Sequence, residues 1–121
     1  MDELTRWLAS KAGIEGVVAE KAISIILGYL RSEGPRDKVQ ALIDKIPGAE
    51  VAISATESDG GQGRLMGGGL MAVGTRLMSL GLDIGDIKNV ARELLRFGRD
   101  KIGEDQMGAI IAKTPGLNQF A

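Results

Sequence analysis

The segment EGVVAEKAISIILGYLRS, residues 15–32, decides the fold class of this 121-residue chain. Its apolar residues cover most of a helix circumference and leave a narrow polar strip through Glu20, Ser24 and Arg31. The β-branched run at 23–26 is compatible with a strand, but a segment of about 18 residues is much longer than ordinary strands. A helix that is apolar nearly all round lies at the centre of a domain. The segment therefore predicts an all-α protein built around this helix.

Helical periodicity continues on both sides of the central segment. Gly13 separates it from an amphipathic helix expected at 2–11, and Gly34-Pro35 separates it from a helix expected at 35–45. Further helices are expected at 64–80, 84–100 (with Asp83 as its N-cap) and 104–113, with a short helical turn at 49–55 and a flexible Gly-rich loop at 56–63. The pattern predicts a single all-helical domain, residues 1–121, folded as a compact bundle of about five to seven helices.

Two parts of the chain are related by a shift of 68 residues. Residues 13–48 align without a gap with residues 81–116, and 9 of the 36 positions are identical. Both copies begin at a glycine and end in Lys-x-Pro-Gly. One helical hairpin cannot cover its own apolar face, so two copies that face each other are favoured. The repeat predicts a bundle built from a duplicated helical hairpin with internal pseudo-twofold symmetry.

The composition excludes many kinds of chemistry. The chain has no His and no Cys, so it lacks an imidazole base, a thiolate nucleophile and the common ligands of zinc and iron–sulfur clusters. With 15 Lys and Arg against 16 Asp and Glu, the net charge of −1 does not attract nucleic acid. We therefore expect a protein that is not an enzyme, with no catalytic residue, no cofactor and no metal, and we do not favour nucleic acid as a partner.

The apolar segments are too short for a membrane span. The longest, residues 65–80, is interrupted by Thr75 and Arg76 and falls short of the ~20 residues that cross a bilayer. The first residues, Met1 to Trp7, carry charges from the second position onward and lack the apolar core of a signal peptide. We expect a soluble, cytoplasmic protein with no membrane span.

Glycines recur at an interval of seven in the segment 64–80 and just after it, at Gly67, Gly74 and Gly81. Each glycine inside a helix costs up to ~1 kcal/mol relative to alanine, so this spacing suggests that another helix approaches closely along that side. The same segment holds two pairs of small residues four apart, Gly63/Gly67 and Gly68/Ala72, whose spacing favours close packing within the chain, with a subunit interface or a helix pair in a bilayer as alternatives. Methionines on the same side offer adaptable contacts. Protein–protein interaction or self-assembly as a homodimer is the favoured function, through Met66, Gly67, Met71, Gly74 and Met78.

Two alternative functions remain open. Basic residues spaced by four, four and three form one stripe on the helix expected at 84–100, namely Lys88, Arg92, Arg96 and Arg99. Such a stripe is ordinarily a solvated face, but it could also bind an anion or nucleic acid. A small apolar ligand held between the two hairpins is the other alternative, since a core rich in Met and Gly can leave gaps.

Several local motifs together are similar to those of a known family. They are Ile46-Pro47-Gly48-Ala49 after a helical hairpin, a Gly-rich loop and helix, Leu80-Gly81-Leu82, and Leu94-Leu95-Arg96-Phe97 in a last helical pair. In this combination the chain resembles the small bacterial VcgC/VcgE-like family of unknown function, over about residues 13–116. The resemblance implies an all-helical bacterial domain, and it implies no activity and no site residues.

Overall fold

The computed structural model describes residues 2–59 and 69–114 of the chain, and the side chains of residues 3–54 and 73–114. Within these residues the chain forms helices and no strand, which confirms the all-α class. The helices are α1 (Asp2–Ala12), α2 (Gly16–Glu33), α3 (Arg36–Asp44), α4 (Ala49–Asp59), α5 (Gly69–Met78), α6 (Ile84–Ile102) and α7 (Glu104–Lys113). None of them is both long and apolar enough to cross a bilayer.

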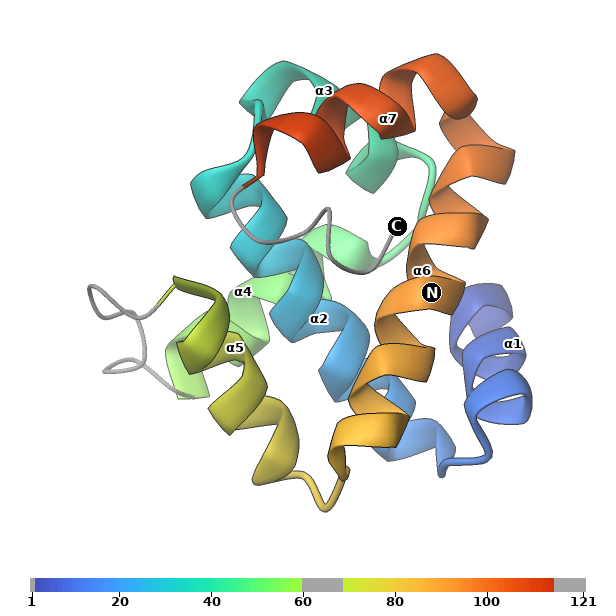
Figure 1. Cartoon of the computed structure of the whole chain (residues 1–121), viewed down its shortest axis with the longest axis vertical. Helices are drawn as coiled ribbons and strands as arrows, with labels where there is room; N and C mark the ends of the chain where they lie inside the picture. Colours follow the sequence, from blue (N-terminus) through green and yellow to red (C-terminus); the bar gives the residue numbers. More distant parts are fainter. Residues whose placement is uncertain (1, 60–68, 115–121) are drawn as a thin grey trace.

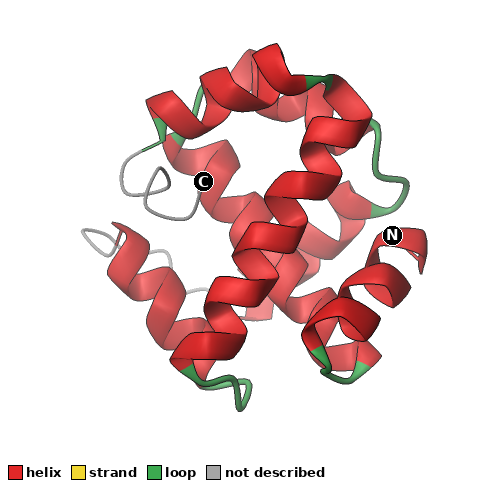
Figure 2. Cartoon of the chain, turned by 45° about the vertical axis from the view of Figure 1, so that its right-hand side comes forward, coloured by secondary structure: helices red, strands yellow, loops and turns green. Residues whose placement is uncertain are grey.

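Helix α2 runs through the middle of the bundle, where α6 packs against it (Figure 1). Helices α1 and α5 lie on opposite flanks of this central pair, and both contact α2 and α6. Helices α3 and α7 lie side by side and close one end of the bundle, as both views show (Figures 1 and 2). Helix α4 packs along α2. Five helices therefore contact α2 directly, which confirms its predicted central place.

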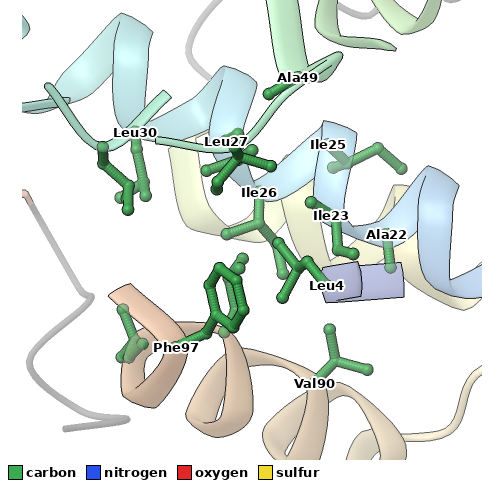
Figure 3. Packing of buried hydrophobic residues seen from close by; sticks show 14 of the residues in the cluster. Leu4, Ala22, Ile23, Ile25, Ile26, Leu27, Leu30, Ala49, Val90 and Phe97 are labelled. Carbon is green, nitrogen blue, oxygen red and sulfur yellow. The ribbon is translucent and has the colours of Figure 1, made fainter. Parts of the chain in front are cut away.

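The core is almost entirely aliphatic and forms where α2 faces its neighbours (Figure 3). Ile23, Leu27 and Leu30 of α2 are fully buried. They share one cluster with side chains from every other helix whose side chains are described, among them Leu4, Leu8, Val39, Leu42, Ile43, Ile53, Leu77, Val90, Leu94, Leu95, Met107 and Ile110. Burial of a Leu or Ile side chain stabilises a fold by roughly 1.5–3 kcal/mol. This cluster is therefore what holds the helices around α2.

The helix boundaries follow from local capping. Asp83 begins α6 with a capping box, because its Oδ1 accepts the N–H of Asp86 at 2.8 Å and its own N–H donates to Asp86 Oδ2 at 3.4 Å. This confirms the predicted N-cap. Gly13 and Gly81 end the segments before α2 and α6 with φ of +69° and +98°, a backbone conformation that favours glycine. Helix α6 continues two residues beyond its expected end, to the residue before Gly103 (φ +93°).

Two expectations about the middle of the chain need correction. Helix α4 extends from Ala49 to Asp59, so residues 56–59 of the expected loop 56–63 are helical, and residues 60–63 lie outside the described residues. The extension has a simple reason, since no Gly or Pro interrupts the chain between Ala49 and Gly60. Helix α5 ends at Met78, before the expected end at residue 80, because Leu80 and Gly81 donate to carbonyls three residues back and Gly81 has a positive φ of +98°. Residues 64–68 of the expected helix lie outside the described residues.

Candidate interaction surfaces

Helix α5 presents one side to the core and another to the surface. Leu77 is fully buried and Val73 packs against the core cluster, so these two residues hold α5 against the bundle. Met78 is 49% exposed on another side of the helix. Gly74 lies one turn before Met78, and residues four apart share a helix face. We call this side of α5, defined by Gly74 and Met78, the Gly/Met face.

The other members of the predicted interaction site cannot be placed to the same extent. Met66 and Gly67 lie outside the described residues, and Met71 lies in α5 with its side chain outside them. Of the five predicted residues, the structure therefore brings together Gly74 and Met78. The spacing of seven that drew attention to Gly67 and Gly81 does not extend along one described helix, because Gly81 follows the end of α5.

The close approach expected from within the chain is not found at Gly74. A Cβ atom built on Gly74 would have no described heavy atom within 4 Å, and the same holds at Gly81. The glycine of α5 is therefore not explained by packing against the described part of its own chain.

Close approaches do occur at glycines that the spacing of seven does not include. A Cβ built on Gly98 of α6 would lie 2.5 Å from Met107 Sδ, whereas one on Gly28 of α2 would make an ordinary van der Waals contact, 3.7 Å from Ile53 Cγ2. At Gly34, after α2, a Cβ would lie 2.7 Å from both the Leu30 carbonyl oxygen and Thr114 Oγ1. Gly98 and Gly34 therefore let helices and helix ends approach each other. In the sequence, the signal for such a close approach is a glycine that lies inside the apolar face of a helix, as in α2 and α6.

The basic stripe forms a continuous surface on α6. Lys88, Arg92 and Arg96 are exposed, and Arg99 is half-buried. An ion pair of 3.8 Å joins Arg96 to Glu93, and within the described residues the side chains of Lys88, Arg92 and Arg99 have no hydrogen bond or ion pair. We call these four residues the basic face of α6. The structure therefore brings the predicted anion-binding residues together on one side of one helix.

A polar cluster that sequence reasoning missed joins α2, α3 and α4. Arg31 Nη1 donates to Glu50 Oε1 at 2.9 Å, while Gln40 Nε2 donates to Glu50 Oε2 at 2.8 Å and to Asp44 Oδ1 at 2.9 Å. The hydrogen bonds from Gln40 and then Arg31 hold the pKa of Glu50 below its ordinary value. The cluster positions the start of α4 against α2 and α3. Nothing in the periodicity of 49–55 signals it, because the partners are distant in sequence.

The aromatic residues Trp7 and Phe97 connect α1 to α6. Their ring centroids are 5.6 Å apart with planes tilted by 44°, and Lys101 Nζ lies 5.1 Å from the Phe97 centroid. Trp7 is half-buried and packs against the core cluster, as expected of an anchoring residue. In the part of the chain that the structure describes, no three carboxylates gather into a group that could hold a metal ion.

Comparisons with known proteins add no relative to this description: no protein-family model, no curated protein and no solved structure matches the chain.

Proposed function

We propose that this chain is a non-catalytic interaction module that pairs with a second copy of itself through the Gly/Met face of α5. The observation that carries the proposal is the open space at Gly74, together with the half-exposed Met78 on the same side. A glycine in the interior of a helix destabilises it by about 1 kcal/mol relative to alanine. A helix of another copy that approaches along Gly74 would give this glycine a structural role.

The chemistry of the face suits a self-complementary contact. In a twofold dimer the same patch lies on both subunits, so Gly74 of one copy can receive Met78 of the other. Methionine adapts its shape to the surface that it meets, and a glycine lets the partner helix come close. Met66, Gly67 and Met71 precede these residues in the sequence at helical spacing, and we include them in the proposed site.

We also propose that the bundle is a duplicated helical hairpin with internal pseudo-twofold symmetry, as in the repeat units 13–48 and 81–116. In support, α2 and α6 begin 68 residues apart, and so do α3 and α7. Lys38 Nζ donates to Gln106 Oε1 at 3.1 Å, and these residues are also separated by 68 positions. Two equivalent residues that touch each other lie close to the axis that relates them. The all-helical fold is also what the resemblance to the VcgC/VcgE-like family implies, and membership in that family is part of the proposal.

Sedimentation equilibrium tests the self-association with three variants. Gly74→Ala should stabilise the isolated chain yet weaken the dimer by about tenfold, because the added methyl group overpacks the interface. Met78→Glu should abolish the dimer by placing two carboxylates in the contact. Gly108→Ala is the matched control, since Gly108 lies inside α7 and its Cβ would also have no described atom within 4 Å. Wild-type protein that remains a monomer at high concentration would disprove the proposal, and so would equal effects of Gly74→Ala and Gly108→Ala on association.

A further inference from the structure

Helix α4 packs against α2 and so shows how a second helix can bind along a long helix of this fold. A stripe on α2 runs through Ser24, Gly28 and Arg31, and Ser24 is only 2% exposed. Helix α4 contacts this stripe at two points: Ile53 Cγ2 lies 3.7 Å from a Cβ built on Gly28, and Glu50 Oε1 accepts from Arg31 at 2.9 Å. An acidic residue in the first turn of the docked helix thus binds an arginine near the end of the receiving helix.

The positions on α6 that correspond to this stripe form its basic face. A shift of 68 residues relates Ser24, Gly28 and Arg31 to Arg92, Arg96 and Arg99, and it relates Glu20 to Lys88. Where α2 is covered by α4, α6 leaves Lys88, Arg92 and Arg96 exposed. We propose that the basic face of α6 docks an acidic amphipathic helix of a partner protein, in the way that α2 receives α4. The inference rests on the proposed duplication and is independent of self-association through α5.

The geometry of the basic face fits a helix that carries carboxylates along one line. Lys88 and Arg99 are eleven residues apart in α6, which corresponds to roughly 16 Å along the helix axis. Acidic residues spaced by three or four on a partner helix match this spacing, and arginine can bind a carboxylate with two parallel hydrogen bonds. Arg92 and Arg96 stand where α2 has the small residues Ser24 and Gly28. The partner helix therefore lies farther from α6 than α4 lies from α2, and its binding depends more on charge. The complex should therefore weaken as salt is added.

The charges beside the basic face favour a narrow acidic helix over a nucleic acid duplex. Asp86, Glu93 and Asp100 form a row on the adjoining side of α6, in which Asp100 is exposed, Asp86 is half-buried, and Glu93 is largely buried and paired with Arg96 at 3.8 Å. A duplex presents phosphates across a broad surface and would meet this acidic row as well as the basic face. A helix with carboxylates along one side can contact the basic face alone.

Titration of the isotope-labelled full chain by NMR tests the inference. The probe is a synthetic helical peptide with Glu at every fourth position, and the matched peptide carries Gln in place of Glu. The Glu peptide should shift the resonances of residues 88–99 at low salt, and the Gln peptide should not. Arg92→Glu with Arg96→Glu should weaken binding at least about tenfold. The pair Lys21→Glu and Arg36→Glu, at exposed sites elsewhere, makes the same change in net charge and should leave binding close to that of wild type.

Other outcomes would overturn the inference. Equal loss of binding in both variant pairs would show that net charge rather than the basic face attracts the peptide. Tighter binding of a short DNA duplex to the same residues, at the same salt concentration, would assign the face to nucleic acid. If the charge-reversed pair fails to fold, Arg92→Gln with Arg96→Gln repeats the test, and unchanged binding there contradicts the inference. A crystal structure in which the two hairpins do not superpose would contradict the proposed duplication. The binding experiments would contradict the docking site, so the two failures can be told apart.

Discussion

Replacement of Gly34 by alanine is the sharpest stability test that the fold offers, because two hydrogen-bonded groups surround this glycine. The new Cβ would lie 2.7 Å from the Leu30 carbonyl oxygen and 2.7 Å from Thr114 Oγ1. The Leu30 oxygen accepts the N–H of Gly34 at 2.7 Å, at the end of α2. Thr114 is 2% exposed, and its Oγ1 donates to the Ile110 carbonyl at 2.6 Å. Neither neighbour can move away without straining a hydrogen bond.

These contacts determine how much Gly34→Ala should lower the free energy of unfolding. Overpacking of a tight site costs about 1–3 kcal/mol, and a strained hydrogen bond adds about 1 kcal/mol. Alanine also has less conformational freedom than glycine in the unfolded chain, which offsets about 0.4–1 kcal/mol of this cost. We therefore expect Gly34→Ala to lower the free energy of unfolding by about 2 kcal/mol, and the Tm by roughly 8 °C.

Urea unfolding followed by Trp7 fluorescence and by circular dichroism measures this loss. Gly108→Ala is the control, since it adds the same methyl group in a helix with open space and should stabilise the protein by about 0.5–1 kcal/mol. Thr114→Ala should recover part of the loss in the double variant, because it removes one of the two obstructing oxygens. A Gly34→Ala protein as stable as wild type would refute the close approach of the α7 end to the α2 end.

Three further predictions concern charge and core packing. Hydrogen bonds lower the pKa of Glu50 in the folded state, so its charged carboxylate stabilises the fold at pH values above its ordinary pKa. This stabilisation is lost as the pH falls from the ordinary pKa through the lowered pKa. In paired urea titrations, wild type should therefore lose more stability than Glu50→Gln between neutral pH and about pH 3. Glu93 Oε1 is buried without a hydrogen bond, and its 3.8 Å ion pair with the exposed Arg96 contributes little, so Glu93→Leu should raise the free energy of unfolding by about 1 kcal/mol, and a clear loss would contradict this. Leu27 is fully buried in α2, so Leu27→Ala should cost about 3 kcal/mol, whereas Val17→Ala, at a 63% exposed site, should have little effect on the urea midpoint.

Helical periodicity and glycine placement predicted most of the helices within one or two residues. Helix α7 has the expected bounds, 104–113, and α2 differs from its expected range by one residue at each end. These helices have an apolar face bounded by Gly or Pro, so the pattern and the breaks agree. The central burial of α2 also followed from its apolar circumference.

Features that depend on tertiary contact could not be predicted from the sequence pattern. Helix α4 has little amphipathic signal of its own, and its start is positioned by Glu50 through Arg31 and Gln40 from other helices. Ser24 belongs to the expected polar strip yet is buried, because its Oγ donates to the Glu20 carbonyl at 2.9 Å within α2 and so needs no water. In each case a partner distant in the chain, or a local hydrogen bond, decides the outcome.

The glycines of the candidate interaction site also show that a sequence pattern cannot identify a tertiary contact. The spacing of Gly67, Gly74 and Gly81 suggested a close approach, but spacing alone does not distinguish packing within the chain from packing between chains. At Gly74 the structure shows open space toward the described residues, so packing against those residues does not account for this glycine. The basic face was visible as a stripe, whereas its correspondence to the α4-covered stripe of α2 required the positions of Glu50 and Ile53.

Disulfide cross-linking tests whether the Gly/Met faces of two copies are in contact. The chain has no cysteine, so Met78→Cys introduces a single thiol on this face, and Ala41→Cys places one at an exposed site on α3. A disulfide requires the two Cα atoms to come within about 7 Å. Under mild oxidation Met78→Cys should form a covalent dimer rapidly, and Ala41→Cys should form little. Equal rates for the two variants, or no covalent dimer of Met78→Cys, would rule out contact between the two Gly/Met faces.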